Sequence, residues 1–314
     1  MKDSNNTMEC AIDKGLRYLE TLYEKKPWAF SATSYTRDRK IFTDSYDYKF
    51  TGLPETFTHF LALDLLGKHL SPLVRSKLVD SLRPSKLQTL NYFVDPSRFP
   101  DDVDTTVLGY TTLLKARVLT EDNVLPVAET VFGNVDDNNG LVELHFKSAE
   151  KRRQKIICAC VCSNVLHFAY TIRQESKLQK TEDYVFDWLK SGNWKQGTLY
   201  YPSGFPFLYY CSNFVKMNYK VQRRFGPVLL SAIKDSLKDC RLPLDYALLL
   251  LALENLGERD YSEEISEILL GLQEDDGSYA PDAIWGDRHG VLYGGKAFST
   301  IIIIGALASA ARFC

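Results

Sequence analysis

The chain has 314 residues, of which 45% are hydrophobic, 25% charged and 12% aromatic, a composition typical of a soluble globular protein and too apolar for intrinsic disorder. Its 38 lysines and arginines nearly balance its 40 aspartates and glutamates, which argues against a broad nucleic-acid-binding surface. The N-terminus shows no secretory signal pattern, and the longest apolar stretch, 297–310, is too short for a comfortable membrane span. We therefore expect a cytoplasmic protein.

Apolar residues recur with the helical period along almost the whole chain. About ten helices are predicted, over residues 8–24, 56–70, 104–119, 156–173, 182–189, 207–217, 228–237, 242–256, 262–272 and 294–311. The main strand candidate is 141–146. The pattern indicates an all-α fold.

Three short segments between these helices resemble one another. Each has a glycine turn, at Gly140, Gly197 or Gly277, followed by a short extended piece that contains or ends on an aromatic residue or proline. Helix pairs joined in this way are typical of repeated αα-hairpins, and several such hairpins closed around one axis form an α/α barrel. We therefore predict a single α/α barrel over residues 1–314 with a central pocket.

The seven cysteines are an odd number, which fits free thiols in a reducing compartment. Cys158, Cys160 and Cys162 alternate along a predicted helix, so their side chains point in different directions and do not readily share a metal. We interpret them as small buried residues.

The segment that carries chemistry lies at the predicted start of the helix near residue 104. Asp102, Asp104, Thr105 and Thr106 follow Pro100 within a few residues. Helix capping accounts for one or two of these side chains. Two carboxyl groups facing one apolar pocket cannot both ionise cheaply, so one of them would keep its proton at neutral pH and act as an acid.

Five ordered segments resemble the class II terpene cyclases, and most closely the cyclase domain of drimane-type sesquiterpene synthases. The acid segment matches the D-x-D-T-T motif of that family. The other four are C-x-N-V-L at 162–166, G-T-x-Y-Y-P at 197–202, Q-x-x-D-G-S-Y at 273–279, and a Y-G-x-x-A segment at 293–297 followed by Thr300. In the last segment, Gly295-Lys296 stands where the family usually has Ser-Arg.

The resemblance implies a terpene cyclase β-domain-like toroid and a reaction that begins with protonation. Asp104 would donate the proton to the terminal alkene of an isoprenyl diphosphate, and Asp102 would orient it. Thr105 and Thr106 would bond the carboxyl groups or the helix end, and Asn164 is a candidate hydrogen-bond partner for the acid. The expected substrate is farnesyl diphosphate, and the expected product is a bicyclic drimane-type diphosphate.

Such a reaction needs aromatic walls for the cations and basic groups for the diphosphate, with Mg²⁺ bound to it. The expected aromatic contacts are Tyr200, Tyr201 and Trp285. The candidate diphosphate-binding residues are Arg98, Arg152, Arg153, Arg288 and Lys296. Because no phosphatase motif precedes the cyclase region, we expect the diphosphate to remain on the product and a separate phosphatase to remove it.

Three other functions stay open from the sequence. A protein-prenyltransferase-like barrel would need a zinc site, which no cysteine and histidine pattern predicts. A glycoside hydrolase would need a second acid across the cleft, and nothing singles one out. A barrel that only binds an isoprenoid or a partner would not need the acid motif.

Overall fold

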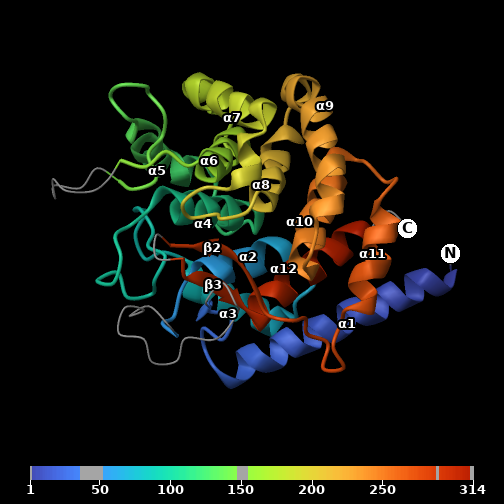
Figure 1. Ribbon diagram of the computed structural model, residues 1–314. Helices are drawn as coiled ribbons and strands as arrows, with labels where there is room; N and C mark the ends of the chain where they lie inside the picture. The colour runs from blue at the N-terminus through green and yellow to red at the C-terminus, as the bar shows by residue number, and fades with distance from the viewer. Residues whose placement is uncertain (1, 36–51, 147–154, 288–289, 312–314) are drawn as a thin grey trace.

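The computed structural model describes residues 2–35, 52–146, 155–287 and 290–311. Six helices form an inner ring in which each contacts the next and the last contacts the first (Figure 1). These inner helices are α2 (Phe57–Leu66), α4 (Val103–Lys115), α6 (Ala159–Thr171), α8 (Phe205–Val215), α10 (Pro243–Leu256) and α12 (Lys296–Ala310). Chain order and contacts together therefore close the ring without a gap.

The remaining α-helices pack around this ring, each joined to the inner helix that follows it in the chain. They are α1 (Lys2–Lys25), α3 (Pro72–Leu82), α5 (Glu121–Gly133), α7 (Gln179–Ser191), α9 (Tyr219–Ser236) and α11 (Ser262–Gly271). Three short 3₁₀ segments lie between helices, at Glu175–Leu178, Asn193–Gln196 and Leu237–Asp239. The described chain thus forms an α/α barrel of six helix pairs.

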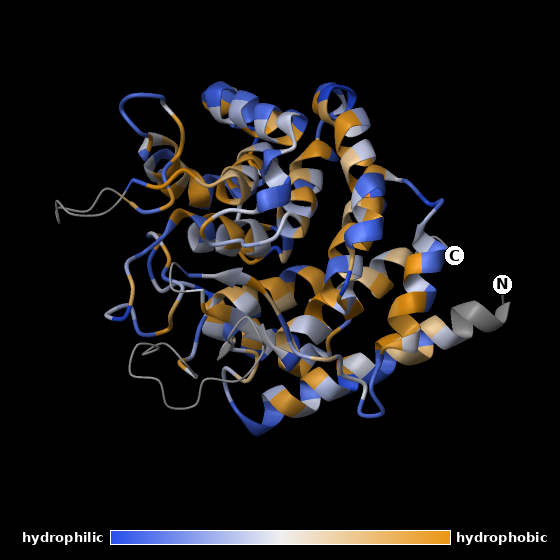
Figure 2. Ribbon diagram, viewed as in Figure 1, coloured by the Kyte–Doolittle hydropathy of each residue, from blue (hydrophilic) through white to orange (hydrophobic). Residues whose placement is uncertain are grey.

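Hydropathy explains which helices lie inside. Helices α2, α10 and α12 are apolar on all sides, as expected of helices that contact protein all round. Helix α7 buries only a stripe that contains Val185 and Leu189 and exposes its charged face. Figure 2 shows the same contrast, with inner helices mainly orange and outer helices carrying blue on one side.

A small antiparallel sheet lies against the barrel. Its strands are β1 (Thr33–Tyr35), β2 (Asp282–Gly286) and β3 (Leu292–Gly295), in the order β1-β3-β2. Gly294 is required in β3 because a Cβ atom there would lie 2.0 Å from the carbonyl oxygen of Asp282. Strands β2 and β3 both contact α12, so the sheet joins the N-terminal end of that helix to the segment after α1.

The all-α prediction and the α/α barrel are confirmed, and each of the ten predicted helices is present. The sequence reading missed α3 and α5. The predicted strand at 141–146 was wrong, since only isolated bridges form there, between Val135 and Val142 and between Asp102 and His145. Within the described ranges, no helix is both long and apolar enough to cross a membrane.

Candidate active site

A cavity of about 150 Å³ lies where the N-terminal end of α4 meets the sheet. It is walled almost entirely by apolar and aromatic surface, and both carboxyl groups of the acid motif face it. Its lining residues are Phe57, Tyr92, Phe93, Phe99, Asp102, Asp104, Thr105, Leu144, His145, Tyr200, Tyr201, Trp285, Gly286, Asp287 and Tyr293. We call it the acid pocket.

Asp102 is the N-cap residue of α4. Its backbone is extended, and its Oδ1 atom accepts a 2.7 Å hydrogen bond from the Thr105 amide. Its Oδ2 atom is buried and has no hydrogen-bond partner in the protein. Burial, opposed by the Thr105 amide and reinforced by the nearby Asp104 carboxyl, raises the pKa of Asp102 to about 8.

Asp104 lies in the first turn of α4 and is 6% exposed. Its Oδ1 atom accepts a 2.8 Å hydrogen bond from Nδ2 of Asn164 on α6, and its Oδ2 atom accepts one from the Tyr201 hydroxyl. Burial raises the pKa of Asp104, and these two donors act in the opposite direction. The expected contact between Asn164 and the acid is therefore confirmed, whereas the role of Tyr201 as a donor to Asp104 was missed.

The two threonines of the motif both contact Asp102 at the start of α4. The Thr106 hydroxyl donates 2.7 Å to the carbonyl of Asp102 and accepts 2.9 Å from the amide of Leu90. The Thr105 amide donates to the side chain of the N-cap residue Asp102. The Thr105 hydroxyl is buried at the acid pocket with no partner in the protein. The expectation that they bond the helix end holds for both.

A tight turn presents Tyr201 to the acid. The Thr198 amide donates 2.6 Å to the Tyr201 carbonyl, and the Tyr201 amide donates 3.1 Å to the Thr198 hydroxyl. Gly197 has φ +68°, and a Cβ atom there would lie 2.4 Å from the Tyr201 carbonyl oxygen. The glycine and threonine of the G-T-x-Y-Y-P segment thus shape the turn that places the tyrosine hydroxyl on Asp104.

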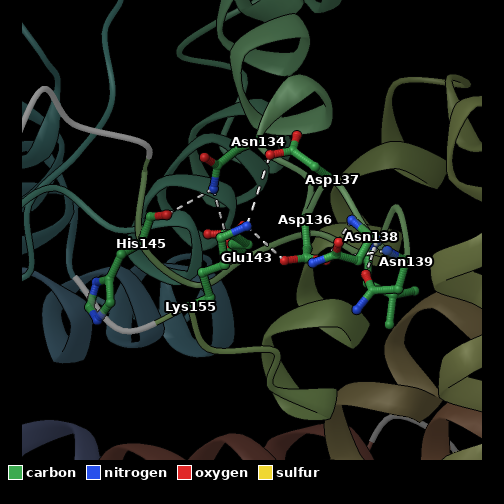
Figure 3. Close-up of polar contacts among 9 residues, drawn as sticks. Asn134, Asp136, Asp137, Asn138, Asn139, Glu143, His145 and Lys155 are labelled. Carbon is green, nitrogen blue, oxygen red and sulfur yellow. Dashed lines mark hydrogen bonds and ion pairs between the residues drawn. The ribbon is translucent and has the colours of Figure 1, made fainter. Parts of the chain in front are cut away.

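A hairpin between α5 and α6 contacts the first turn of α4 through the backbone. The Val103 amide donates 2.9 Å to the Leu144 carbonyl, and the Leu144 amide donates 2.9 Å to the Ile156 carbonyl. Figure 3 shows the side chains that hold this hairpin. Asn134 donates to the carbonyls of Glu143 and His145, and Lys155 lies 3.0 Å from an Asp136 carboxylate oxygen. The first turn of α4 is thereby held to this hairpin by a backbone hydrogen bond.

The aromatic walls come from four regions of the chain. The three aromatic residues expected from the sequence, Tyr200, Tyr201 and Trp285, all line the acid pocket. The indole nitrogen of Trp285 donates 3.0 Å to the Tyr92 hydroxyl, which fixes both rings. The sequence reading missed five further aromatic residues in the lining, which are Phe57, Tyr92, Phe93, Phe99 and Tyr293.

Two of the five predicted diphosphate-binding residues, Arg98 and Lys296, lie in the described part of the chain, and neither lines the acid pocket. Arg98 pairs with Asp95 at 3.1 Å on the surface, and its side chain is 51% exposed. Lys296 pairs with Glu274 at 2.6 Å and with Asp276 at 3.3 Å. Both cations are thus paired with carboxylates, and neither lines the acid pocket.

The other three candidates, Arg152, Arg153 and Arg288, lie outside the described residues. In the described part of the chain, no lysine or arginine lines the acid pocket.

Two of the resembling segments also make structural contacts. In the Q-x-x-D-G-S-Y segment, the Gln273 amide group donates 2.8 Å to the Ala11 carbonyl of α1, so it closes the ring of helix pairs. In the last segment, Gly294 belongs to β3, and the Thr300 hydroxyl accepts 3.1 Å from the Tyr279 amide.

The three cysteines near the start of α6 are core residues, and no metal site is found among the described residues. Cys158, Cys160 and Cys162 are buried free thiols at the start of α6, as expected of small core residues. Over the ranges that the structure describes, no group of three or more histidine, cysteine, aspartate or glutamate side chains could hold a metal ion. The described residues therefore offer no ligand set for the zinc of a protein-prenyltransferase-like barrel.

Comparison with known proteins agrees with this geometry. Residues 31–172, just under half of the chain, match the family described as the sesquiterpene cyclase astC-like C-terminal domain, and this range contains Asp102, Asp104 and Asn164. The drimenol cyclase drtB of Aspergillus calidoustus is 31% identical over 140 residues, which are 43% of this chain and 25% of that protein. The chain thus spans about a quarter of the length of this relative.

Solved structures show the same fold. The type II terpene cyclase MstE from Scytonema superposes with a TM-score of 0.71 over 99% of both chains, at 11% identity. The ent-copalyl diphosphate synthase from Streptomyces platensis superposes with a TM-score of 0.57 over 82% of this chain and 50% of that one, at 15% identity. The chain resembles class II terpene cyclases in sequence, and its α/α barrel is the fold found in their structures.

Proposed function

We propose that the protein is a class II terpene cyclase that protonates a linear isoprenyl diphosphate and cyclises it without releasing the diphosphate. The observation that carries this proposal is the acid pocket, in which two buried carboxyl groups share an aromatic-walled cavity and one of them is held by two hydrogen-bond donors. Carboxylic acids with raised pKa values in such cavities are typical proton donors.

Asp104 is the proposed proton donor. Burial raises the pKa of Asp104 and so favours the neutral form, from which a proton can pass to an alkene in the pocket. Asn164 and Tyr201 donate hydrogen bonds to its two oxygens. These bonds strengthen as the proton leaves and negative charge develops on the Asp104 carboxyl group. They therefore stabilise the transition state more than the ground state, which is what lowers the barrier.

Asp102 sets the environment of this acid. Its Oδ1 atom is committed to the Thr105 amide, and its own raised pKa keeps it neutral at pH 7. A neutral neighbour adds no negative charge beside Asp104, so the Asp104 carboxylate that forms on proton transfer is not repelled. Asp102 also fixes the first turn of α4 and with it the direction of Asp104.

Protonation of the alkene forms a carbocation, and the aromatic walls of the acid pocket limit which groups can react with it. The faces of Trp285, Tyr92 and Phe57 lie around the cavity, with the rings of Phe57 and Trp285 in edge contact at 5.2 Å. Aromatic faces attract cations without forming bonds to them. The cation would therefore be captured by the substrate's own double bonds until a final deprotonation or water capture.

The finer proposal is that the substrate is farnesyl diphosphate and the product a drimane-type bicyclic diphosphate. The match to the astC-like family and to a drimenol cyclase supports it. We further propose that a separate phosphatase acts on the product, and that catalysis takes place in the cytoplasm.

The diphosphate anchor is proposed from the sequence. Arg288 directly follows the pocket residue Asp287, and Arg152 and Arg153 follow the pocket residue His145 by a few positions. Mg²⁺ would be held mainly by the diphosphate oxygens and would screen their charge.

Product analysis tests this function. Purified protein is incubated with farnesyl or geranylgeranyl diphosphate and Mg²⁺, and the products are examined before and after treatment with an added phosphatase. The proposal predicts a cyclic diphosphate that yields an alcohol only after that treatment. Linear products only, or release of pyrophosphate by the purified protein, would overturn it.

A further inference from the structure

The turn between β2 and β3 brings a third carboxyl group to the acid pocket. Asp287, in this turn, and Tyr293, on β3, both line the pocket and are partly exposed. Asp102 and Asp104, in contrast, are only 5% and 6% exposed. Among the described residues of the lining, Asp287 therefore carries the one carboxyl group that lies outside the acid motif and closer to solvent.

Hydrogen bonds fix the position of the Asp287 carboxyl group. Its Oδ2 atom accepts 3.1 Å from the Tyr293 hydroxyl, and its Oδ1 atom accepts 3.1 Å from the Val291 amide. The Asp287 amide also donates 3.0 Å to the Val291 carbonyl, so backbone and side chain close the turn together. A carboxylate oxygen has two lone pairs, and the group can therefore take up a proton while it keeps these bonds.

The backbone also ties this group to the acid. The Gly286 amide donates 2.9 Å to the Tyr200 carbonyl. Tyr201, the next residue, donates through its hydroxyl to Asp104. Asp104 and Asp287 are thus connected through one contact between the G-T-x-Y-Y-P turn and the β2–β3 turn, which holds the two carboxyl groups in a fixed relation around the same cavity.

The chemistry of cyclisation separates the place where a proton enters from the place where one leaves. Asp104 would protonate the terminal double bond, and each ring closure then moves the positive charge along the chain toward the diphosphate. After two closures of a farnesyl chain, the charge lies on the double bond nearest the diphosphate. The last proton is therefore lost at the diphosphate end, and a charged diphosphate favours the side of the pocket that is open to water.

We propose that Asp287 is the base that ends the cyclisation and that Tyr293 positions its carboxylate. The inference rests on the proposed function and names the base for its last step. Asp287 takes a proton from a carbon next to the cationic centre, and the electrons of that C–H bond form the double bond of the product. The substrate thus gains one proton from Asp104 and loses one to Asp287, which then releases it to solvent.

Two other groups of the lining are less well placed for this step. His145 forms an isolated antiparallel bridge with Asp102, so it lies beside the acid segment. The Tyr92 hydroxyl accepts the indole N–H of Trp285. A carbocation is so strongly acidic that even a weak base can accept its proton, and position therefore selects the base more than basicity does.

A pair of amide variants separates this role from the shaping of the turn. Asp287→Asn keeps an oxygen for the Val291 amide but removes the basic carboxylate. Asp282→Asn is the matched control, because Asp282 lies on β2, is 8% exposed, accepts 2.7 Å from the Ala283 amide and does not line the acid pocket. Both variants carry the same chemical change on the same sheet.

The ratio of products from farnesyl diphosphate and Mg²⁺, measured after phosphatase treatment, is the readout. The wild type and Asp282→Asn should each form one cyclic alkene isomer. Asp287→Asn should still cyclise the substrate, since Asp104 is intact, but the share of other alkene isomers and hydroxylated products should rise about tenfold or more. Because only folded molecules turn over, this ratio does not depend on how much of a variant folds.

Two further variants test the carboxylate and its partner. Asp287→Glu keeps a carboxylate and should restore most of the wild-type product ratio. Tyr293→Phe removes the hydrogen bond to Oδ2 and should shift the ratio in the same direction as Asp287→Asn, to a smaller extent and at unchanged KM. An unchanged ratio in Tyr293→Phe would contradict its positioning role.

Several results would overturn the assignment of Asp287. These are an unchanged product ratio in Asp287→Asn, a hydroxylated product from the wild type, and a folded Asp287→Asn protein that forms no cyclic product. A higher KM or Mg²⁺ requirement in Asp287→Asn with unchanged products would place the residue in diphosphate binding instead. Failure of the proposed function looks different, because the wild type itself would then form no cyclic diphosphate.

Discussion

The two ends of α4 offer opposite environments to polar side chains. At its N-terminal end, Asp102 and Asp104 face a cavity of about 150 Å³ with aromatic walls, and burial raises the pKa of both. Toward its C-terminal end, Thr111 borders a small polar cavity, and Lys115 pairs with Asp64 near the surface. The same helix thus presents its acids to an aromatic cavity at one end and a polar side chain to a smaller cavity near its other end.

The largest expected effect comes from removing the acid at the N-terminal end of α4. Asp104→Asn keeps the shape and the partners Asn164 and Tyr201 but has no proton of sufficient acidity, so kcat should fall by at least ~10²-fold. Turnover rates and thermal unfolding measured together check this. A variant that folds and turns over like the wild type would mean that the proton comes from another group.

A smaller loss is expected when one donor to the acid is removed. Tyr201→Phe deletes the hydrogen bond to Asp104 Oδ2 and should lower kcat by about tenfold or more with little change in KM. Tyr279→Phe is the control, since Tyr279 is also fully buried but lies outside the acid pocket. Equal effects of the two changes would show that only packing was lost.

The pH dependence of stability sharpens the contrast between the two ends. The pKa of Asp102 is about 8 in the folded protein against an ordinary 3.8, so between these values the folded state holds a proton that the unfolded chain has lost. Its contribution to stability is complete below pH 3.8 and is lost as the pH rises through about 8.

Denaturant titrations across this range, compared with Asp102→Asn, measure the effect. The wild type should lose unfolding free energy relative to the variant as the pH rises, by an amount on the order of a few kcal/mol. A constant difference between the two proteins would mean that Asp102 is ionised at neutral pH.

The smallest expected change in kcat comes from loosening the hairpin that contacts the N-terminal end of α4. Lys155→Met removes the ion pair with Asp136, loosens the hairpin whose Leu144 carbonyl accepts from the Val103 amide, and should lower kcat severalfold at constant KM. Lys234 of α9 forms a 3.4 Å pair with Glu258, and Lys234→Met, which breaks this pair, should leave kcat unchanged. An equal change in kcat in both variants would show that the hairpin does not position the acid.

The sequence predicted well what depends on local pattern. The density of apolar residues located all six inner helices, because a helix that packs against protein on all sides is apolar on all its faces. Helix α3, which buries only Val74, Leu78 and Leu82, and α5, which contains Pro126, have weaker local signals and were missed. The acid motif was found because its four residues lie within five positions of one another.

Features made by tertiary contacts could not be predicted in the same way. Phe57 and Tyr92 reach the acid pocket only because the ring of helices closes, and their sequence neighbours gave no sign of it. Lys296 was expected at the pocket, but its neutralisation depends on Glu274, from a segment 22 residues earlier that packs beside it. Asn164 was identified through the C-x-N-V-L resemblance and not through periodicity.

The central claim is that catalysis begins with a proton delivered from solvent by way of Asp104, and turnover in D₂O tests it most directly. Farnesyl diphosphate is incubated with the protein and Mg²⁺ in D₂O, and the product is analysed by mass spectrometry and NMR after removal of the phosphates. The account predicts one deuterium per product molecule, on the ring carbon that was the CH of the terminal double bond, with the diphosphate retained until the phosphatase is added. A cyclic product without deuterium at that carbon would contradict it.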